Sequence, residues 1–550
     1  MKVLLIGINA KYIHPTMSIY QLKYNTQYDC DIKEFTIKEG LQKIYSTIES
    51  LIFEHNYELI GFSCYLWNIE MIIELTSFIK QKFPKINIVL GGPEVCYEAD
   101  YFFKNSNVDY IIFSEGEEAF DKLLNFLDNK ITIEEVPNLY YKKNNLIKYT
   151  YNKLPDLNNI KLATLEIEDK VNRIIYVESS RGCPYNCSYC VASLEKRVRF
   201  FNKDEVFRVL KELMKSQVKT IKFLDRTFNA NEKYMLDILD FIEEHNICSV
   251  FQFEIVIEKM SDLVIKHILN LKNVHLRFEI GIQSTNHLTN EAVGRHQNFE
   301  KLKENTFKLN KAPHIDLHLD LIAGLPYENL NCFKNSFNEA FLLEGKELQL
   351  GFLKFLRGTK MMDFIEEHEY IYDKKAPYEI ICNKYISSEE LKYIHTIEHS
   401  LEYYYNNSTK YNRQRLKKSF QYLFDHNLIT DPWSFFEELS QIEIKSNQLI
   451  DLFIGFDEYF KTKDYYEEIH FLIIQDYLEN FLVKPTIWWG KNDLISTYQD
   501  IILDNISELN QHILFNYCIV VESVDLLYII KYYDYKYQTY IIKKESIVNK

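Results

Sequence analysis

Three cysteines lie close together near the middle of the chain, at Cys183, Cys187 and Cys190. They follow an apolar stretch, 174–177, and their spacing is Cys-x3-Cys-x2-Cys. Thiolates are the ligands that iron–sulfur clusters need, and three of them on one short loop can hold three corners of a cubane. The fourth iron then has no protein ligand and can chelate a small molecule through an amine and a carboxylate. The spacing therefore predicts a cluster that takes part in chemistry.

Two simpler interpretations of these cysteines stay open. Zinc also binds cysteine, but it takes four ligands, usually from paired CxxC knuckles, and the next cysteine, Cys248, falls on a predicted apolar strand. The three residues could instead be small packed hydrophobes, which is a common role of cysteine.

The segments after the cysteines must position them. Strand and helix patterns alternate there, which is typical of α/β folds, and ligand sites in such folds lie at the carboxyl ends of the strands. Acidic residues recur near these ends, although an acid at a strand end is often only a helix cap. The expected strands cover 174–177, 220–225, 248–255, 275–282, 316–323 and 347–355, and the expected helices cover 204–217, 232–245 and 261–271.

The first 140 residues show the same alternation, which predicts a parallel, doubly wound (Rossmann-like) sheet. Strands are expected over 2–8, 59–64, 86–90 and 110–113, with a helix over 69–83. The loops after these strands, where a ligand is expected, are 9–16, 65–68, 91–94 and 115–117. No GxGxxG motif follows the first strand, so a dinucleotide site is weakly supported. An ordinary flavodoxin-like domain is the simpler alternative.

The last 165 residues differ from the rest. Helices are expected over 389–405 and 413–427 and from 432, and 516–523, 526–533 and 536–543 look strand-like or mixed. The region is rich in tyrosine, and we favour a role as a cap over the preceding α/β region that selects the substrate, although aromatic residues also simply pack.

Charge and hydropathy restrict the possible partners. The formal net charge is −15, from 64 basic and 79 acidic residues, which argues against a general binder of nucleic-acid backbones. A short basic run, 196–199, borders the cysteines and is expected to be a solvated or phosphate-facing loop. No apolar stretch is long enough for a membrane helix, and only a few apolar residues precede Gly7, too few for a signal peptide. A cytoplasmic protein without a membrane partner is expected.

The cysteine motif, with the aromatic Tyr189 before its third cysteine, resembles the CxxxCxφC motif of the radical S-adenosylmethionine (SAM) enzymes. A doubly wound domain ahead of such a motif resembles the cobalamin-dependent members, and the last region resembles an uncharacterised C-terminal extension found in one subgroup of them. The resemblance covers about residues 1–380. It implies a cobalamin-binding domain at 1–140, a linker at 141–170, a partial (β/α)6 barrel at 171–380 and a mainly helical C-terminal domain at 385–550.

The resemblance also implies three cofactors, namely a 4Fe–4S cluster, SAM and cobalamin. Cys183, Cys187 and Cys190 would be the cluster ligands. The cobalamin contacts would come from Asn9, Tyr65, Trp67, Asn68, Gly91, Gly92, Pro93, Glu115, Gly116 and Glu117. Residues near the ends of the barrel strands would contact SAM, and these are Asp225, Arg226, Glu254, Glu279, Gln283, Ser284, Gly324, Leu325, Pro326 and Phe355.

One departure concerns the lower face of the cobalt. Many cobalamin proteins carry an Asp-x-His-x-x-Gly motif whose histidine ligates cobalt, and none occurs here. His14 is the only histidine in the first loop, and a surface role is expected for it. The resemblance nominates Trp67 as the residue below the cobalt, and it predicts a cob(II)alamin EPR spectrum without nitrogen superhyperfine splitting. The alternative for Trp67 is a boundary aromatic whose indole N–H is satisfied.

The implied activity is reductive cleavage of SAM followed by methylation of an unactivated carbon of an unknown substrate. The runner-up is a cobalamin-assisted rearrangement or cyclisation without methyl transfer. A redox-sensing module and a transfer RNA modification enzyme are further alternatives. A flavodoxin or ferredoxin is expected to supply the electrons. No catalytic side chain is nominated from the sequence.

Overall fold

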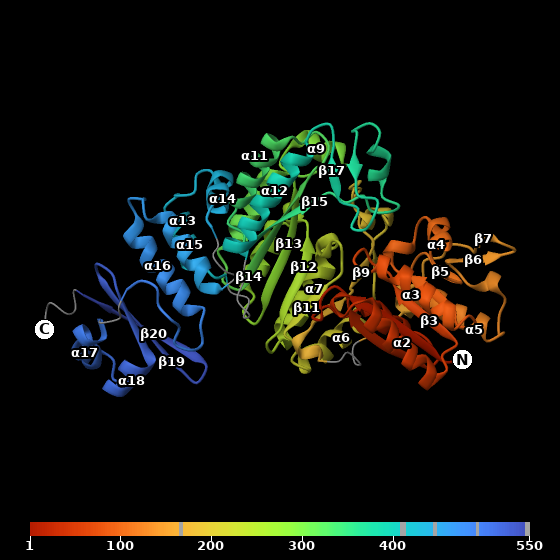
Figure 1. Cartoon of the computed structure of the whole chain (residues 1–550), viewed down its shortest axis with the longest axis horizontal. Coiled ribbons are helices and arrows are strands. Elements are labelled where there is room, and N and C mark those ends of the chain that lie inside the picture. The colour runs from red at the N-terminus through yellow and green to blue at the C-terminus, as the bar shows by residue number, and fades with distance from the viewer. Residues whose placement is uncertain (164–168, 407–413, 444–447, 491–493, 545–550) are drawn as a thin grey trace. The chain divides into compact units, whose positions relative to one another are not determined.

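The structure is a computed structural model that describes the chain except for residues 164–168, 407–413, 444–447, 491–493 and 545–550 (Figure 1). The contacts within the chain divide the chain into two compact units. The first comprises Met1–Ser336 and Leu350–Leu391, and the second comprises Phe337–Gln349 and Lys392–Lys550.

A sheet with strand order β2-β1-β3-β4-β5-β6-β7 forms the N-terminal part of the first unit. The strands from β2 to β5 pair in parallel, as predicted for a doubly wound domain. These strands are β1 (Val3–Asn9), β2 (Cys30–Thr36), β3 (Leu59–Ser63), β4 (Asn87–Gly91) and β5 (Tyr110–Ile112). The helices between and beside them are α1 (Met17–Tyr24), α2 (Leu41–His55), α3 (Ile69–Lys82), α4 (Ala99–Asn105) and α5 (Glu117–Leu127).

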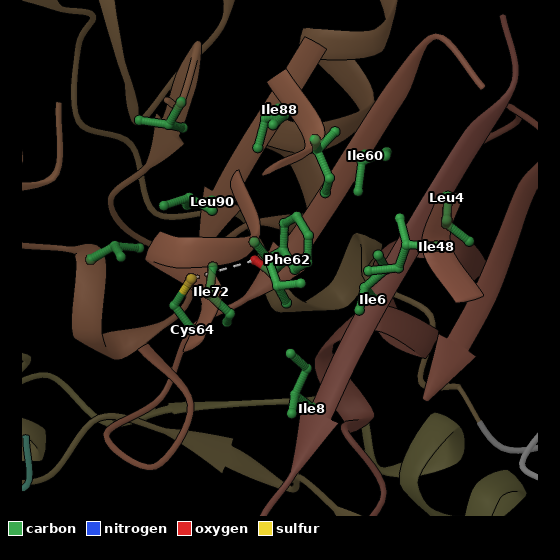
Figure 2. Close-up of a cluster of buried hydrophobic side chains, with 14 of the residues drawn as sticks. Leu4, Ile6, Ile8, Ile48, Ile60, Phe62, Cys64, Ile72, Ile88 and Leu90 are labelled. Carbon is green, nitrogen blue, oxygen red and sulfur yellow. Dashed lines mark hydrogen bonds between the residues drawn. The ribbon is translucent and has the colours of Figure 1, made fainter. Parts of the chain in front are cut away.

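The burial of this sheet on both faces explains why its strands are continuous apolar runs in the sequence. Ile6, Ile60 and Ile88 lie on neighbouring strands and are fully buried beneath Ile48 of α2 and Ile72 of α3 (Figure 2). The alternate residues of β1 are buried as well. A parallel strand covered on both faces has no polar side to show, so apolar residues fill consecutive positions.

The segment expected to be a linker, 141–170, begins with structure that belongs to the sheet. β6 (Leu139–Lys143) and β7 (Leu146–Tyr149) form an antiparallel hairpin beside β5. Its two turn residues, Asn144 and Asn145, have φ of 54° and 61°, the left-handed conformation that tight hairpins require and asparagine tolerates. The Lys-Lys-Asn-Asn run is therefore a hairpin turn rather than a break. Residues 164–168 of the expected linker lie outside the described residues.

The six strands predicted for the barrel form one sheet, in the order β15-β14-β13-β12-β11-β8. Neighbouring strands from β8 to β14 are parallel. They are β8 (Ile174–Val177), β11 (Thr220–Phe223), β12 (Val250–Ile255), β13 (His275–Gln283), β14 (Ile315–Ala323) and β15 (Glu347–Phe352). The α/β fold class and the partial barrel are thus confirmed.

Helices α6 (Lys203–Lys215), α7 (Glu232–His245), α8 (Asp262–Asn270), α9 (His287–Ala292), α10 (Phe299–Asn310) and α11 (Leu330–Phe341) alternate with these strands. Side-chain caps fix where several of them begin. Asn202, Asn231, Ser261 and Asn298 each accept a hydrogen bond from a backbone N–H of the first turn of α6, α7, α8 and α10, respectively. Short strands flank the barrel: β9 (Ser180–Arg181) pairs with β10 (Arg199–Phe200), and β16 (Ile371–Tyr372) pairs with β17 (Ile380–Cys382).

The second unit is mainly helical and ends in an antiparallel sheet. Its helices are α12 (Ser388–Leu401), which begins in the first unit, α13 (Lys417–Asp425), α14 (Pro432–Ser440), α15 (Leu449–Phe460), α16 (Tyr466–Glu479), α17 (Leu494–Asn505) and α18 (Gln511–Tyr517). β18 (Cys518–Glu522), β19 (Leu526–Tyr533) and β20 (Lys536–Lys543) match the predicted strands closely. Residue 413, where the second predicted helix starts, lies outside the described residues. Aromatic side chains such as Tyr404, Phe436 and Trp433 are buried here, so many of the tyrosines and phenylalanines serve packing.

Candidate functional site

The cysteine loop follows β8, the first strand of the barrel sheet. Gly182 has φ of 91°, and a Cβ there would lie 2.4 Å from the Arg197 carbonyl oxygen, so the chain can make this turn only with glycine. The Cys183 N–H donates to the Glu195 carbonyl at 2.9 Å, and the Ser188 N–H donates to the Val293 carbonyl at 2.9 Å. Backbone bonds thus hold the loop at both its first and its middle cysteine.

Two of the three cysteines are buried, the third is partly exposed, and arginine side chains lie near them. Cys183 and Cys187 are buried, and burial raises the pKa of the Cys190 thiol while Arg226 lowers it. The Cys183 Sγ is 3.6 Å from the Thr227 Oγ1, and an Arg295 guanidinium nitrogen is 4.0 Å from the Cys187 Sγ. Positive charge beside thiolates favours the ionised form that ligates metal.

The residues present fit an iron–sulfur cluster with a bound small molecule. Within the described residues, the buried Nε of Arg295 and Oε1 of Gln283 have no hydrogen-bond partner, although both belong to this region. Buried polar atoms without partners are rare and call for a ligand or water. Zinc would need a fourth ligand beside the three cysteines, and within the described residues no group of three or more His, Cys, Asp or Glu side chains is arranged to hold a single metal ion.

The residues predicted near SAM fall into two groups. Arg226, Glu254 and Gln283 lie at or just after the carboxyl ends of β11, β12 and β13, and the exposed Arg226 contacts Glu254 at 3.4 Å. Glu279 pairs with Glu254 in the sheet register, but it lies in the middle of β13 and not at its end, because the strand continues to Gln283. Gln283 has φ of 68°, unusual for a residue other than glycine.

The other predicted SAM residues are held within the protein. Asp225 is buried and accepts hydrogen bonds from the Ser179 N–H at 2.8 Å and from the hydroxyls of Ser179 and Ser180. Burial raises the pKa of Asp225 to about 6. Ser284 donates to Glu328. The remaining residues are Gly324, with φ of 90°, the buried Leu325 and its neighbour Pro326, and Phe355, which stacks on Tyr372.

An aromatic pair stands at the carboxyl edge of the N-terminal sheet. Trp67 stacks on Tyr65, with ring centroids 4.5 Å apart and planes 4° apart, and 48% of Trp67 is exposed. The Trp67 indole N–H donates to the Ile8 carbonyl at 3.0 Å, which fixes the ring while leaving area open. Both sequence interpretations of Trp67, an accessible ring face and a satisfied N–H, are thus compatible with the geometry.

Other residues nominated for cobalamin shape the loops around this pair. Asn68 is buried and donates to the carbonyls of Ile8 and Ser63, and Asn9 donates to Glu34 at 2.8 Å. A Cβ on Gly92 would lie 2.5 Å from the Cys64 carbonyl oxygen, and Pro93 begins the short helical turn that follows. A Cβ on Gly91 would meet only the Ile112 Cβ, at 4.0 Å, whereas one on Gly116 would press against Leu22.

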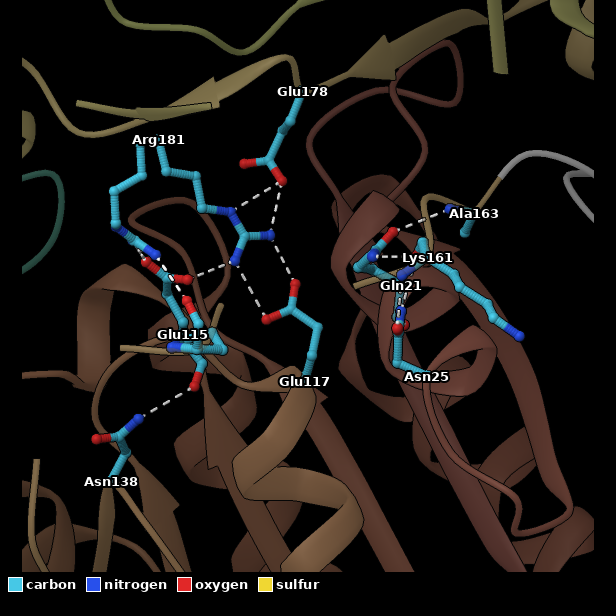
Figure 3. A network of polar contacts seen from close by, with 11 residues as sticks. Gln21, Asn25, Glu115, Glu117, Asn138, Lys161, Ala163, Glu178 and Arg181 are labelled. Atoms are coloured by element: carbon cyan, nitrogen blue, oxygen red, sulfur yellow. Dashed lines mark hydrogen bonds and ion pairs between the residues drawn. The ribbon is translucent and has the colours of Figure 1, made fainter. Parts of the chain in front are cut away.

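Ion pairs join the N-terminal sheet to the cysteine loop. Arg181, two residues before Cys183, contacts Glu117 at 2.6 Å, Glu115 at 2.7 Å and Glu178 at 2.7 Å (Figure 3). Arg199 also pairs with Glu115, so the predicted solvated loop at 196–199 is wrong for this residue, whose side chain is 14% exposed. Glu115 and Glu117 were predicted as cobalamin contacts, which stays a prediction, and their carboxylates pair with these arginines. Arg181 lowers the pKa of the buried Glu117.

Further polar contacts join the N-terminal domain to the barrel. Arg357, after β15, donates to the buried Glu94 at 3.1 Å, and Arg173 pairs with Glu34 at 2.7 Å. The His14 Nδ1 lies 2.6 Å from the Tyr176 hydroxyl of β8. The expectation that His14 is a surface residue is therefore wrong, because the first loop reaches the barrel.

Sequence reasoning missed several of these side chains, including Arg181, Arg295 and Arg357. Arg295 is 108 residues from Cys187, and Arg357 is 263 residues from Glu94. No local spacing signal connects such residues, although a single arginine directly before the motif could have been flagged.

Three family models match this chain: a B12 binding domain at residues 4–124, the radical SAM superfamily at 177–340, and a protein of unknown function (DUF4080) at 366–544. No helix among the described residues is long and apolar enough to cross a membrane.

Curated relatives are similar over part of their length. An uncharacterized methyltransferase, PH0819, of Pyrococcus horikoshii is 24% identical over 41% of this chain and 51% of its own. The cobalamin-dependent radical SAM methyltransferase TokK of Streptomyces tokunonensis is 23% identical over 50% of this chain and 44% of its own. The chain thus spans about half the length of these relatives.

Solved structures share the fold. The cobalamin-dependent SAM radical enzyme OxsB, with aqua-cobalamin and SAM bound, matches with a TM-score of 0.60 and 14% identity, over 93% of this chain and 81% of its own. The radical SAM methyltransferase TsrM from Kitasatospora setae, with cobalamin and a [4Fe-4S] cluster bound, gives 0.59 and 12%, over 68% and 76%.

Proposed function

Because this chain belongs to the radical SAM superfamily and carries a B12-binding domain, we propose that it is a cobalamin-dependent methyltransferase acting on an unactivated carbon. Curated relatives named as methyltransferases support this activity. The substrate is not named by this proposal, and the electron donor would be a flavodoxin or ferredoxin. The chain would comprise a cobalamin-binding domain at 1–149, which includes the β6–β7 hairpin, a linker that ends at residue 170, a radical SAM barrel at 171–380 and a C-terminal domain at 385–550.

Cys183, Cys187 and Cys190 would hold the cluster, and the loops at the edge of the N-terminal sheet would hold cobalamin. When bound, the cluster supplies the electron that cleaves SAM to methionine and a 5′-deoxyadenosyl radical, and cobalamin carries the methyl group. Gln283 offers a buried acceptor to SAM, and Arg226 and Arg295 offer positive charge beside the thiols. The stacked Tyr65 and Trp67 offer a flat surface to cobalamin.

One observation carries the proposal. Arg181 binds Glu115 and Glu117 at the carboxyl edge of the N-terminal sheet, and two residues later the chain enters the cysteine motif. The two cofactor loops are therefore tied to each other by buried charges. Such an arrangement keeps two cofactors at a fixed separation, which a reaction using both requires.

The test is product analysis under anaerobic reducing conditions, with cobalamin, SAM and a cell extract as the substrate source. Methyl transfer predicts both 5′-deoxyadenosine and S-adenosylhomocysteine, and both should disappear in C183A, C187A and C190A. Formation of 5′-deoxyadenosine without S-adenosylhomocysteine would favour rearrangement or cyclisation instead. If reduced, cluster-loaded protein releases neither product, the proposal fails and a sensing role returns.

A further inference from the structure

We propose that the inner face of the barrel sheet binds a polar substrate that carries an ionised group, rather than a hydrocarbon lipid. This inference rests on the proposed function and specifies its substrate class. It is drawn from the strand register, the burial pattern and the ion pairs of the barrel. The substrate class is a water-soluble small molecule.

The strand register aligns one polar layer across the sheet. Tyr176 pairs with Lys222, Lys222 with Gln252, Gln252 with Arg277, and Arg277 with Asp316. Residues at paired positions in a parallel sheet point to the same face. Five neighbouring strands thus each contribute a side chain that can form hydrogen bonds, and three of the five carry a formal charge.

A second polar layer lies two residues further along the strands. Glu254 pairs with Glu279, and Glu279 pairs with His318, again on the same face. In β13, this face also carries Arg277, and its residues are partly accessible while the alternate ones are buried. The inner face is therefore charged over two successive layers.

The opposite face of the same sheet is lined with apolar residues. Phe223, Phe253 and Phe278 occupy the alternate positions of three neighbouring strands and are fully buried. The ring of Phe253 contacts the rings of both Phe223 and Phe278. This face forms the core under the helices. A barrel that held a hydrocarbon lipid would need a similar lining on its inner side, because polar groups facing an apolar ligand lose their hydration without compensation.

A central ion pair organises the inner face. The Lys222 Nζ contacts both carboxylate oxygens of Glu279, at 2.7 and 2.8 Å, and Gln252 also donates to Glu279. Each side chain of the pair is 21% exposed. An ion pair inside a barrel is a weak source of stability, since its desolvation cost offsets the attraction. Because the ion pair is partly exposed, Lys222 or Glu279 can exchange its partner for a charged group of a ligand.

The N-terminal domain reaches the same layer. His14 contacts the Tyr176 hydroxyl at 2.6 Å, and burial, with the charge of Lys222 contributing, lowers the pKa of His14. The loop that carries His14 is one of those expected to contact cobalamin. The polar layer therefore adjoins the loops assigned to the methyl carrier.

The experiment uses SAM labelled in its methyl group, with the cobalamin- and cluster-loaded enzyme and a cell extract separated into aqueous and chloroform fractions. We expect label to enter a small molecule of the aqueous fraction. Label that enters only the chloroform fraction overturns the substrate class but leaves methyl transfer intact. Release of neither 5′-deoxyadenosine nor S-adenosylhomocysteine would instead overturn the proposed function.

Variants of the ion pair test the assigned residues. The variant K222M should lower the aqueous label per 5′-deoxyadenosine released at least tenfold, because Lys222 is not among the residues assigned to SAM and Glu279 keeps its hydrogen bond from Gln252. The matched control is K219M, since Lys219 lies directly before β11 and contacts Asn172 away from the inner face. An unchanged ratio of label to 5′-deoxyadenosine in K222M would overturn the role of the pair.

Discussion

Trp67 is the residue for which the lower face of the cobalt can be tested directly. Its indole N–H is bound to Ile8 and its ring is half exposed, so the ring has an open face but offers no nitrogen lone pair. The cob(II)alamin EPR spectrum of the wild-type protein should therefore lack nitrogen superhyperfine splitting. W67H should introduce a nitrogen triplet, because a neutral imidazole is a good metal ligand. A triplet in the wild-type spectrum would contradict this assignment.

Glu328 predicts a pH dependence of stability. It is buried, accepts hydrogen bonds from Ser284 and Ser336, and has a pKa raised by burial from 4.5 to about 8. Between these two values the folded chain holds a proton that the unfolded chain has released, so stability falls as pH rises through this window. The neutral mimic E328Q should lose less Tm than wild type between pH 5 and pH 8, by several degrees, in thermal unfolding scans. Parallel Tm curves would show that Glu328 is ionised in the folded chain.

At the scale of elements, the Arg181 cluster holds the strand before the cysteines against α5 of the N-terminal sheet. R181Q would leave Glu115, Glu117 and Glu178 short of a partner, and breaking a buried pair typically costs about 3–5 kcal/mol. We expect a lower Tm and, in addition, loss of iron on anaerobic desalting, because the cysteine loop loses its anchor.

The control for this prediction is R173Q. Arg173 and Glu34 form another buried pair along the same boundary, but Arg173 lies ten residues before Cys183 and on the other side of β8. R173Q should lower the Tm to a similar extent and retain its iron. Equal iron loss in both variants would mean that the Arg181 cluster acts through general stability alone.

The elements also show what a single sequence can predict. Every barrel strand was predicted, although in β13 the apolar residues alternate with polar ones that face the inside of the barrel. The edge strand β2 was missed, since its residues are only partly buried and its pattern, Cys-Asp-Ile-Lys-Glu-Phe-Thr, is mixed. The β6–β7 hairpin was wrongly predicted to be part of a linker, because its turn residues, Asn144 and Asn145, are of a type that is also common in loops.

At the scale of the molecule, the family resemblance could be predicted, and the matching family models confirm it. The cysteine motif carried that prediction, since its chemistry is local. The contacts that join the two cofactor loops could not be predicted, because Arg181 and Glu115 are separated by 66 residues and meet only in the folded chain. The individual cofactor contacts remain predictions.

The most direct measurement counts iron and cobalt per chain after anaerobic purification from cells supplied with cobalamin. The account predicts about four iron atoms, with cobalt in comparable amount to protein. The triple variant C183A/C187A/C190A should lose its iron, whereas C248A, which removes an exposed cysteine, should keep it. Iron retained by the triple variant, or wild-type protein that binds zinc in place of iron, would contradict the central claim.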